Sequence, residues 1–210
     1  MLLLIVLGEM SGVRRYGNIL VYPSQGRLIF ATDFHGQIGD FRRVASRFRR
    51  RVSRGEDIYL LFAGDFVHGP RPDQVRGWLK KDESPAILEA LESLLAEFPE
   101  RVHSLLGNHE HGHLGGPKTQ KFYRGLEDDV SALENRLGAS RTAEICALFA
   151  SFALVALTPC GVMFTHAAPG ASQATLTDIA SARLDRADRL VMELLWPRVI
   201  DSPERLDAVF

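Results

Sequence analysis

Three short apolar runs alternate with two amphipathic segments in the first half of the chain. The runs cover residues 28–31, 58–63 and 102–106. Between them, residues 38–52 and 87–95 place apolar side chains at helical spacing. Parallel strands need a crossover between them, which is usually a helix. The alternation therefore predicts a βαβαβ unit and restricts the chain to the α/β fold class.

Each of these runs ends in polar residues of the kind that bind metals. Asp33 and His35 follow the first run, Asp65 follows the second, and Asn108 and His109 follow the third. Residues two apart on an extended chain share a face, so the first pair should point the same way. Open α/β sheets bind ligands at the carboxyl ends of their strands. We therefore expect these side chains to meet at one edge of the sheet.

A fourth strand end adds another ligand type. Residues 152–157 and 162–165 read as two strands of a hairpin, and His166 follows the second one. Imidazole, carboxylate and amide groups together suit zinc, iron or manganese, and the absence of a thiolate argues against a structural zinc knot. Asp65 lies between the two halves of this set and could bridge two ions. Two such ions can clamp the oxygens of a phosphoryl displacement.

The motifs resemble those of the calcineurin-like metallophosphoesterases, over about residues 27–197. They are Asp33-Phe34-His35-Gly36-Gln37, Gly64-Asp65, Gly107-Asn108-His109-Glu110 and Thr165-His166. They look closest to the phosphoprotein phosphatase branch, which contains serine/threonine phosphatases and diadenosine tetraphosphatases. The resemblance implies a four-layer α/β/β/α sandwich with mixed sheets. We expect this domain to occupy residues 27–210, with residues 1–26 forming an N-terminal extension and a first hairpin strand.

The resemblance also implies a role for each motif residue. The metal ligands would be Asp33 and His35 for one ion, Asn108 and His166 for the other, and Asp65 as the bridge. The cofactors would be two ions of manganese, iron or zinc. A hydroxide bridging them would attack phosphorus directly, without a phosphoenzyme, and His109 would protonate the leaving oxygen as general acid.

The chain departs from the pattern of that branch at several positions. His68 stands where the branch has the carboxylate that orients the general acid, and Gly69 stands where it has a phosphate-binding arginine. Leu106 replaces a second arginine. We therefore assign a weak substrate-binding role to His68 and to Arg71, the next arginine along the chain. No histidine follows His166, so we expect an incomplete second sheet and a truncated C-terminal part.

The remaining segments give simpler expectations. Residues 18–22 and 27–32 read as strands joined by a hairpin turn at 23–26. Helices are expected over residues 118–137, 143–149, 176–184 and 187–196. His103 is predicted to be structural, and His111 and His113 to be loop residues rather than ligands.

Composition and charge limit the partners that the chain can have. A net charge of −1 gives no general attraction to nucleic acid or anionic lipid. The apolar run of residues 1–8 is too short to span a bilayer and reads as a strand or extension rather than a clipped export signal. The arginines of residues 42–54 form a solvated helix face or, alternatively, a docking face for an acidic or nucleic-acid partner. Two cysteines make no disulfide framework, and a cytoplasmic location is expected.

Two functions from different classes follow from these observations. The first is a metal-dependent phosphoester hydrolase, with a phosphoprotein, a nucleotide or another small phosphoester as the substrate. The alternative is a catalytically impaired or truncated relative that acts in binding or regulation. The sequence leaves the oligomeric state open.

Overall fold

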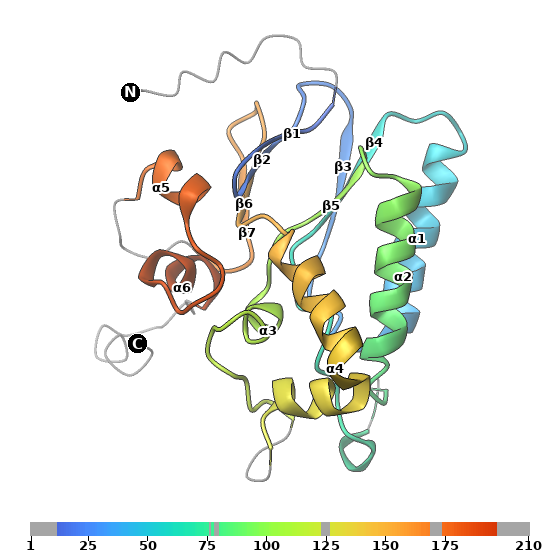
Figure 1. The fold of residues 1–210 in the computed structure, drawn as a ribbon. Coiled ribbons are helices and arrows are strands. Elements are labelled where there is room, and N and C mark those ends of the chain that lie inside the picture. The colour runs from blue at the N-terminus through green and yellow to red at the C-terminus, as the bar shows by residue number, and fades with distance from the viewer. Residues whose placement is uncertain (1–11, 76, 78–79, 123–126, 169–173, 197–210) are drawn as a thin grey trace.

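A computed structural model of the chain describes residues 12–75, 77, 80–122, 127–168 and 174–196 (Figure 1). Its strands are β1 (Arg14–Tyr16), β2 (Ile19–Val21), β3 (Arg27–Ala31), β4 (Ile58–Phe62), β5 (Val102–Ser104), β6 (Val155–Leu157) and β7 (Met163–Thr165). Its helices are α1 (Ile38–Val52), α2 (Ser84–Glu97), α3 (Asn108–His111), α4 (Asp129–Ala150), α5 (Leu176–Ser181) and α6 (Arg189–Leu195), with a short 3₁₀ helix η1 (Pro72–Gln74).

The strands form two sheets. Strands β3, β4 and β5 pair in parallel in that order, which confirms the predicted βαβαβ unit. The second sheet has the order β1-β2-β6-β7 and is mixed, because β2 pairs in parallel with β6 and the other neighbours are antiparallel. A single bridge between Leu105 and Ala153 connects the two sheets.

The buried side chains of β4 show how the layers stack. Ile58, Leu60 and Phe62 belong to the core cluster that includes the buried faces of α1 and α2. Tyr59 and Leu61 belong to a smaller cluster shared with β2 and β6, between the sheets. Successive side chains of a strand point to opposite faces, so β4 is covered on both. Figure 1 shows α1 and α2 outside one sheet and α5 and α6 outside the other, which gives the expected α/β/β/α order.

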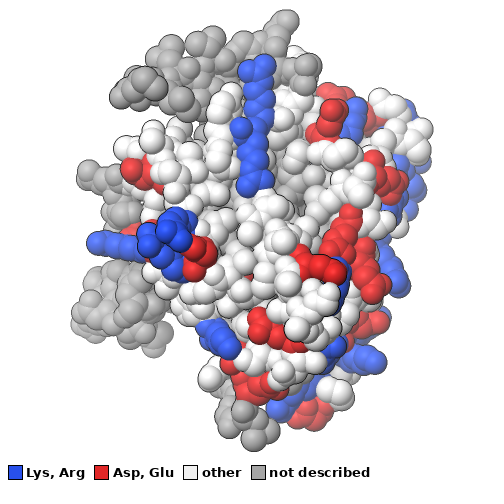
Figure 2. Space-filling view, in the orientation of Figure 1, with Lys and Arg blue, Asp and Glu red and all other residues white. Residues whose placement is uncertain are grey.

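Helix α1 confirms its sequence pattern. Ile38, Phe41, Ala45 and Phe48 are buried, and most of the arginines between them are exposed. Arg49 on α1 pairs with Glu97 on α2. Figure 2 shows acidic and basic atoms interspersed along this side of the molecule rather than one basic patch. The arrangement agrees with a solvated helix face.

The predicted hairpin turn at residues 23–26 is wrong. Strands β2 and β3 on either side of it lie in different sheets, so this segment is a crossover between layers. The hairpin lies earlier, between β1 and β2, where Gly17 adopts a φ of 56°. The side-chain amide of Asn18 in that turn donates to the carbonyl oxygen of Ala182 at 2.8 Å. Local turn chemistry marks a reversal but does not say which strands it joins.

The helix expected from residue 118 begins only at Asp129. Its N-cap is Asp128, whose carboxylate accepts a hydrogen bond from the backbone N–H of Ser131 at 2.7 Å. Residues 118–122 are outside any helix, and residues 118–121 line a cavity described below. The helices expected at 118–137 and 143–149 correspond to two helical stretches of α4, because Gly138, with a φ of 76° and a ψ of 165°, interrupts the helix between them. Helices α5 and α6 are shorter than expected.

Two predictions fall outside the described residues. These are the N-terminal run of residues 1–8 and the tail after residue 197. Among the helices that the structure describes, none combines the length and the apolar character needed to cross a bilayer.

Candidate metal centre

The predicted site residues meet at one cavity of about 830 Å³. Its wall contains the five predicted metal ligands, which are Asp33, His35, Asp65, Asn108 and His166, together with His109. His68 is buried behind His109, with their Nδ1 atoms 2.9 Å apart. Arg71 is absent from the described lining of the cavity and pairs with Asp73 on η1. The structure thus brings the metal ligands together and leaves Arg71 outside.

The loops that carry these side chains are bent into an unusual backbone conformation. Asp33, His35, Asp65 and His68 have φ values of 59°, 43°, 57° and 65°. They are the non-glycine residues with positive φ among those that the structure describes. Such a conformation costs about 1–3 kcal/mol per residue and tends to cluster at functional sites. The strain falls on residues that the sequence motifs single out.

Phe34 holds the first loop to the core. Its ring is buried and lies 5.8 Å from that of Phe66 and 5.7 Å from that of Phe62, between centroids. Asp33 and His35 on either side therefore project away from the core, into the cavity. The alternation explains why an aromatic residue stands between two polar ligands.

The second and third loops touch through their glycines. A β-carbon on Gly64 would lie 2.3 Å from the backbone nitrogen of Gly107, far inside contact distance. Gly69 is similarly close to the first loop, because its β-carbon would lie 2.5 Å from the carbonyl oxygen of His35. The packing of this backbone thus excludes an arginine at position 69.

Glu110 fixes the loop that presents Asp65. It is fully buried, and its carboxylate accepts hydrogen bonds from the backbone N–H groups of Asp65 at 2.7 Å and Phe66 at 2.8 Å. Burial raises the pKa of Glu110 to about 7. Burial also raises the pKa of Asp65. The sequence motif contained Glu110 but gave it no role, and only the folded loop shows that it binds backbone donors.

His35 and His166 each turn one ring nitrogen, Nε2, toward the cavity. The Nδ1 of His166 lies 2.6 Å from the carbonyl oxygen of Ala63, and the Nδ1 of His35 lies 3.4 Å from that of Val67. A carbonyl only accepts, so each ring can donate from Nδ1, and its Nε2 would then be the nitrogen available to a metal. Metal-binding histidines are commonly oriented by such a hydrogen bond from the other ring nitrogen.

The atoms that converge on the cavity are mostly acceptors. The Nε2 of His35 is 3.5 Å from Asp33 Oδ1 and 3.7 Å from Asp65 Oδ2. On the other side of Asp65, its Oδ1 is 3.6 Å from the Nε2 of His166. The Nε2 of His166 is also 2.9 Å from the side-chain oxygen of Asn108. In this orientation of the Asn108 amide, its oxygen faces only acceptors. Acceptors gathered around the predicted bridging carboxylate are suited to binding cations. Alternatively, a rotated Asn108 amide would turn its nitrogen toward the Nε2 of His166 and satisfy the contact between these two side chains.

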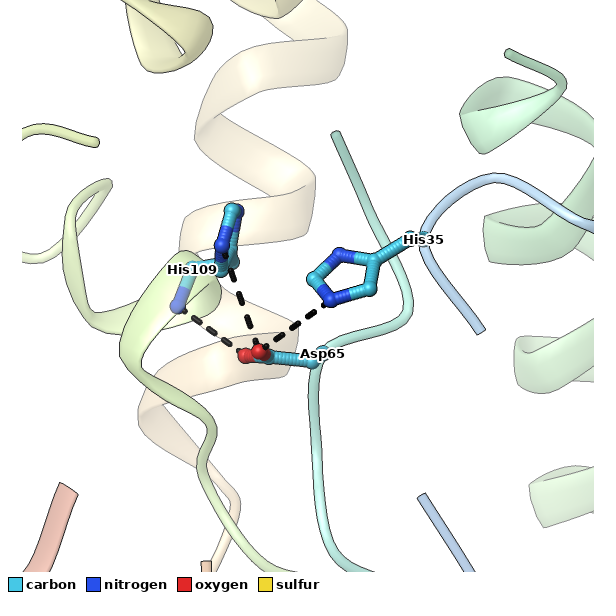
Figure 3. A group of neighbouring side chains, drawn as sticks. All are labelled: His35, Asp65 and His109. Carbon is cyan, nitrogen blue, oxygen red and sulfur yellow. Dashed lines mark hydrogen bonds and ion pairs between the residues drawn. The ribbon is translucent and has the colours of Figure 1, made fainter. Parts of the chain in front are cut away.

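The pKa values of Asp33 and His109 are also shifted from their ordinary values. The hydrogen bond with His35 holds the pKa of Asp33 well below its usual value, so its carboxylate is ionised. Burial lowers the pKa of His109 to about 2, and its Nε2 lies 4.0 Å from Asp65 Oδ2. Figure 3 shows the rings of His35 and His109 facing the same carboxylate of Asp65, and their centroids lie 4.7 Å apart. His109 is thus placed for proton transfer beside the predicted bridge.

The segment of residues 118–121 forms a wall of the cavity that the sequence reading missed. The Nζ of Lys121 lies 2.9 Å from the Nε2 of His35. Lys118, also in the wall, is held away by Asp128 at 3.4 Å and by the hydroxyl of Ser131 at 2.9 Å. Helical spacing had suggested a helix here, and no motif marked either lysine. The two lysines lie near the site because the chain passes back along the cavity after α3.

Two other histidines were predicted to be loop residues, which is wrong for His111 and confirmed for His113, in the turn that follows α3. His111 is buried in α3, with its Nε2 3.1 Å from the carbonyl oxygen of Arg186. The side chain of His113 is fully buried and contacts Glu134 at 2.9 Å. The glycine-rich sequence suggested an exposed loop, but α4 and the segment before α6 cover it. His103 lies in β5, beside the ring of Tyr22, and agrees with a structural role.

The sequence model of the calcineurin-like phosphoesterases matches residues 26–209, so the chain belongs to that family. Among solved structures, the fold is similar to that of a protein serine/threonine phosphatase from Saccharomyces cerevisiae with similarity to human phosphatase PP5. The TM-score is 0.56 at 20% sequence identity, and the match covers 83% of this chain and 52% of that one. The chain thus spans about half the length of that phosphatase. The predicted family and fold class are confirmed.

Replacing Glu110 tests its support of the Asp65 loop. We expect Glu110→Gln to lower the free energy of unfolding by about 1–3 kcal/mol, because the amide nitrogen would face backbone donors. Urea denaturation at pH 8 measures this, since Glu110, with a pKa of about 7, is mostly ionised there. Glu144→Gln, an exposed change on α4, is the control. Equal stability of both variants would contradict the role.

Proposed function

We propose that the chain is a metal-dependent phosphoester hydrolase that transfers the phosphoryl group directly to water. The observation that supports this most strongly is the convergence of four other predicted metal ligands around Asp65, with His109 beside them. In the reaction, the oxygen of water bonds to phosphorus as the ester P–O bond breaks. The products are inorganic phosphate and an alcohol.

The residues of the site fit two ions of manganese, iron or zinc. Asp33 and His35 would hold one ion, Asn108 and His166 the other, and Asp65 both. When bound, such ions polarise the phosphoryl oxygens and lower the pKa of a water molecule. The acceptor-rich arrangement of the described side chains supports this assignment, because a cation supplies what the acceptors lack.

The side chains around the cavity favour direct attack by water. None of the described residues that line it is a serine or a cysteine. The hydroxyl of Thr119 lies against His68 and His109, at 3.5 and 3.4 Å from their Nδ1 atoms. His109 would give a proton from Nε2 to the leaving oxygen. An entering phosphate brings negative charge close to this imidazole, which favours its protonated form.

Lys121 is the group that we propose for binding the phosphate of the substrate. Gly69 and Leu106 leave the arginine positions of the phosphatase branch without a cation. The Nζ of Lys121 reaches the floor of the cavity, 2.9 Å from His35. If His35 binds a metal, its lone pair is used and the ammonium group is left facing the cavity. An ammonium binds phosphate as a point charge rather than as the bidentate fork of arginine.

The substrate is then a phosphomonoester of a protein, a nucleotide or another small molecule. The cavity of about 830 Å³ is large enough for any of these. A purely binding or regulatory role is less well supported. Such a role would not explain why the loops that carry the proposed ligands adopt strained backbone conformations beside His109, the proposed proton donor.

Changing the bridging ligand tests the reaction. We expect Asp65→Asn to lower turnover of p-nitrophenyl phosphate with manganese by at least ~100-fold and to reduce bound metal, because the bridge loses its charge. His68→Ala should cost only about 10-fold, the lower end of the loss for groups behind a catalytic residue. Metal content and steady-state rates are the measurements. Equal losses in both variants, or turnover by metal-free protein, would refute the assignment.

Changing Lys121 tests the phosphate contact. Lys121→Ala should raise KM for p-nitrophenyl phosphate and the inhibition constant of inorganic phosphate about 10-fold, with a smaller change in kcat, as expected for lost charge-assisted binding. Lys118→Ala is the matched control, because Lys118 is engaged by Asp128 and Ser131. Identical effects of the two substitutions would assign the binding to another group.

A further inference from the structure

A chain of hydrogen-bonded side chains leads away from the cavity behind His109. The Nδ1 of His109 lies 2.9 Å from the Nδ1 of His68. The Nε2 of His68 lies 3.0 Å from the Nε2 of His113. The Nδ1 of His113 lies 2.9 Å from Glu134 Oε1. Three imidazoles thus connect the cavity to a carboxylate on α4.

Burial keeps the three imidazoles of this hydrogen-bonded series away from bulk water, whereas Glu134 at its far end is partly exposed. His68 and His109 are 3% and 4% exposed, and the side chain of His113 is fully buried. The ring of Phe149 packs against His113 at 5.7 Å between centroids. The side chain of Glu134 is 32% exposed. A carboxylate there stays hydrated, so the chain ends in a stable negative charge.

The contacts allow one assignment of ring protons. Burial lowers the pKa of His68 and His113, so each of these two rings is neutral and carries a single proton. Ionised Glu134 only accepts, so His113 donates to it from Nδ1 and accepts at Nε2. His68 then donates from Nε2 and accepts at Nδ1, and His109 donates from Nδ1. The Nε2 of His109, which faces Asp65, is left with the lone pair.

We propose that Glu134 is a positioning residue for His109, and that it acts through His113 and His68. The chain selects the tautomer and the ring orientation in which Nε2 of His109 exchanges protons with the cavity. The inference rests on the proposed function, since it assigns the support of that reaction's general acid. His68 and His113 thereby supply a relay at the position where the phosphatase branch has a directly bonded carboxylate.

The backbone holds His68 in the middle of this relay. Its φ of 65° turns the loop back toward His109. Its backbone N–H donates to the hydroxyl of Ser84, at the start of α2, at 3.0 Å. A strained residue anchored in this way keeps the central ring at a fixed distance from both neighbours.

A metal ion at the same place is a less satisfactory explanation. His68, His109 and Asp129 lie close enough together to be considered as ligands. The carboxylate of Asp129, however, accepts hydrogen bonds from the backbone N–H groups of Lys121 at 2.7 Å and Phe122 at 3.0 Å. Its oxygens are therefore engaged at the start of α4.

Comparing substrates with different leaving groups distinguishes a residue that supports the general acid from one that only stabilises the fold. Phenyl phosphate needs a proton on its leaving oxygen, whereas 2,4-dinitrophenyl phosphate does not. We expect Glu134→Gln to lower kcat for phenyl phosphate about 10–100-fold, as for other groups behind a catalytic residue. The kcat for 2,4-dinitrophenyl phosphate should change less than about twofold within the same scheme. Glu144→Gln, also on α4, should leave both unchanged. Equal losses on both substrates, or none, would overturn the proposal.

Histidine NMR tests the inference without turnover. In ¹⁵N-histidine spectra of the metal-free protein, His109 should be the Nδ1–H tautomer, and Glu134→Gln should move it toward Nε2–H. A wild-type Nε2–H tautomer, or spectra unchanged by Glu134→Gln, would overturn the relay. Failure of the proposed function would look different, because wild-type protein would then hydrolyse neither ester while the tautomer still responded to Glu134.

Discussion

The hydrogen bonds from the backbone of Asp65 and Phe66 to the buried carboxylate of Glu110 are the interaction on which the site depends. They fix the turn after β4, where Asp65 adopts a left-handed conformation. The same contact ties this turn to α3, which begins with Asn108. Because Gly64 and Gly107 have no side chains, the two loops can approach closely enough for this contact. Asp65 and His109, the predicted bridging ligand and the predicted general acid, are thereby held close together.

Two of the groups around this unit, Lys121 and Glu134, come from the part of the chain between the third and the fourth motif. Packing against His35 excludes an arginine at Gly69, and Lys121 occupies the wall of the cavity instead. His68 replaces a carboxylate, and the negative charge behind it is provided by Glu134. Both replacements lie at or after residue 121, where the chain passes back over the site before and within α4. Charge complementarity can thus be maintained by residues with no fixed spacing from the motifs.

The errors of the sequence reading have two physical causes. The hairpin expected at residues 23–26 failed because a turn signal is local, whereas pairing of β2 with β6 depends on residues more than 130 positions apart. His111 and His113 were read as loop residues because glycines surround them, yet His111 lies in α3 and neighbouring elements bury both. Glu110 was visible in a motif, but its partners are backbone N–H groups, which carry no signal in the residue types.

The sequence alone determined the α/β class, the βαβαβ unit of three parallel strands and the five residues of the candidate metal centre. These features follow from periodicity and from the rule that the carboxyl ends of parallel strands meet at one edge. Only the tertiary structure decided which groups surround the centre, which are Lys121, Glu110 and the relay from His68 to Glu134. In these contacts, His68 and His109 are 41 positions apart in the sequence, and His35 and Lys121 are 86 positions apart. Such contacts arise from the packing of layers, for which neither periodicity nor motif spacing is a guide.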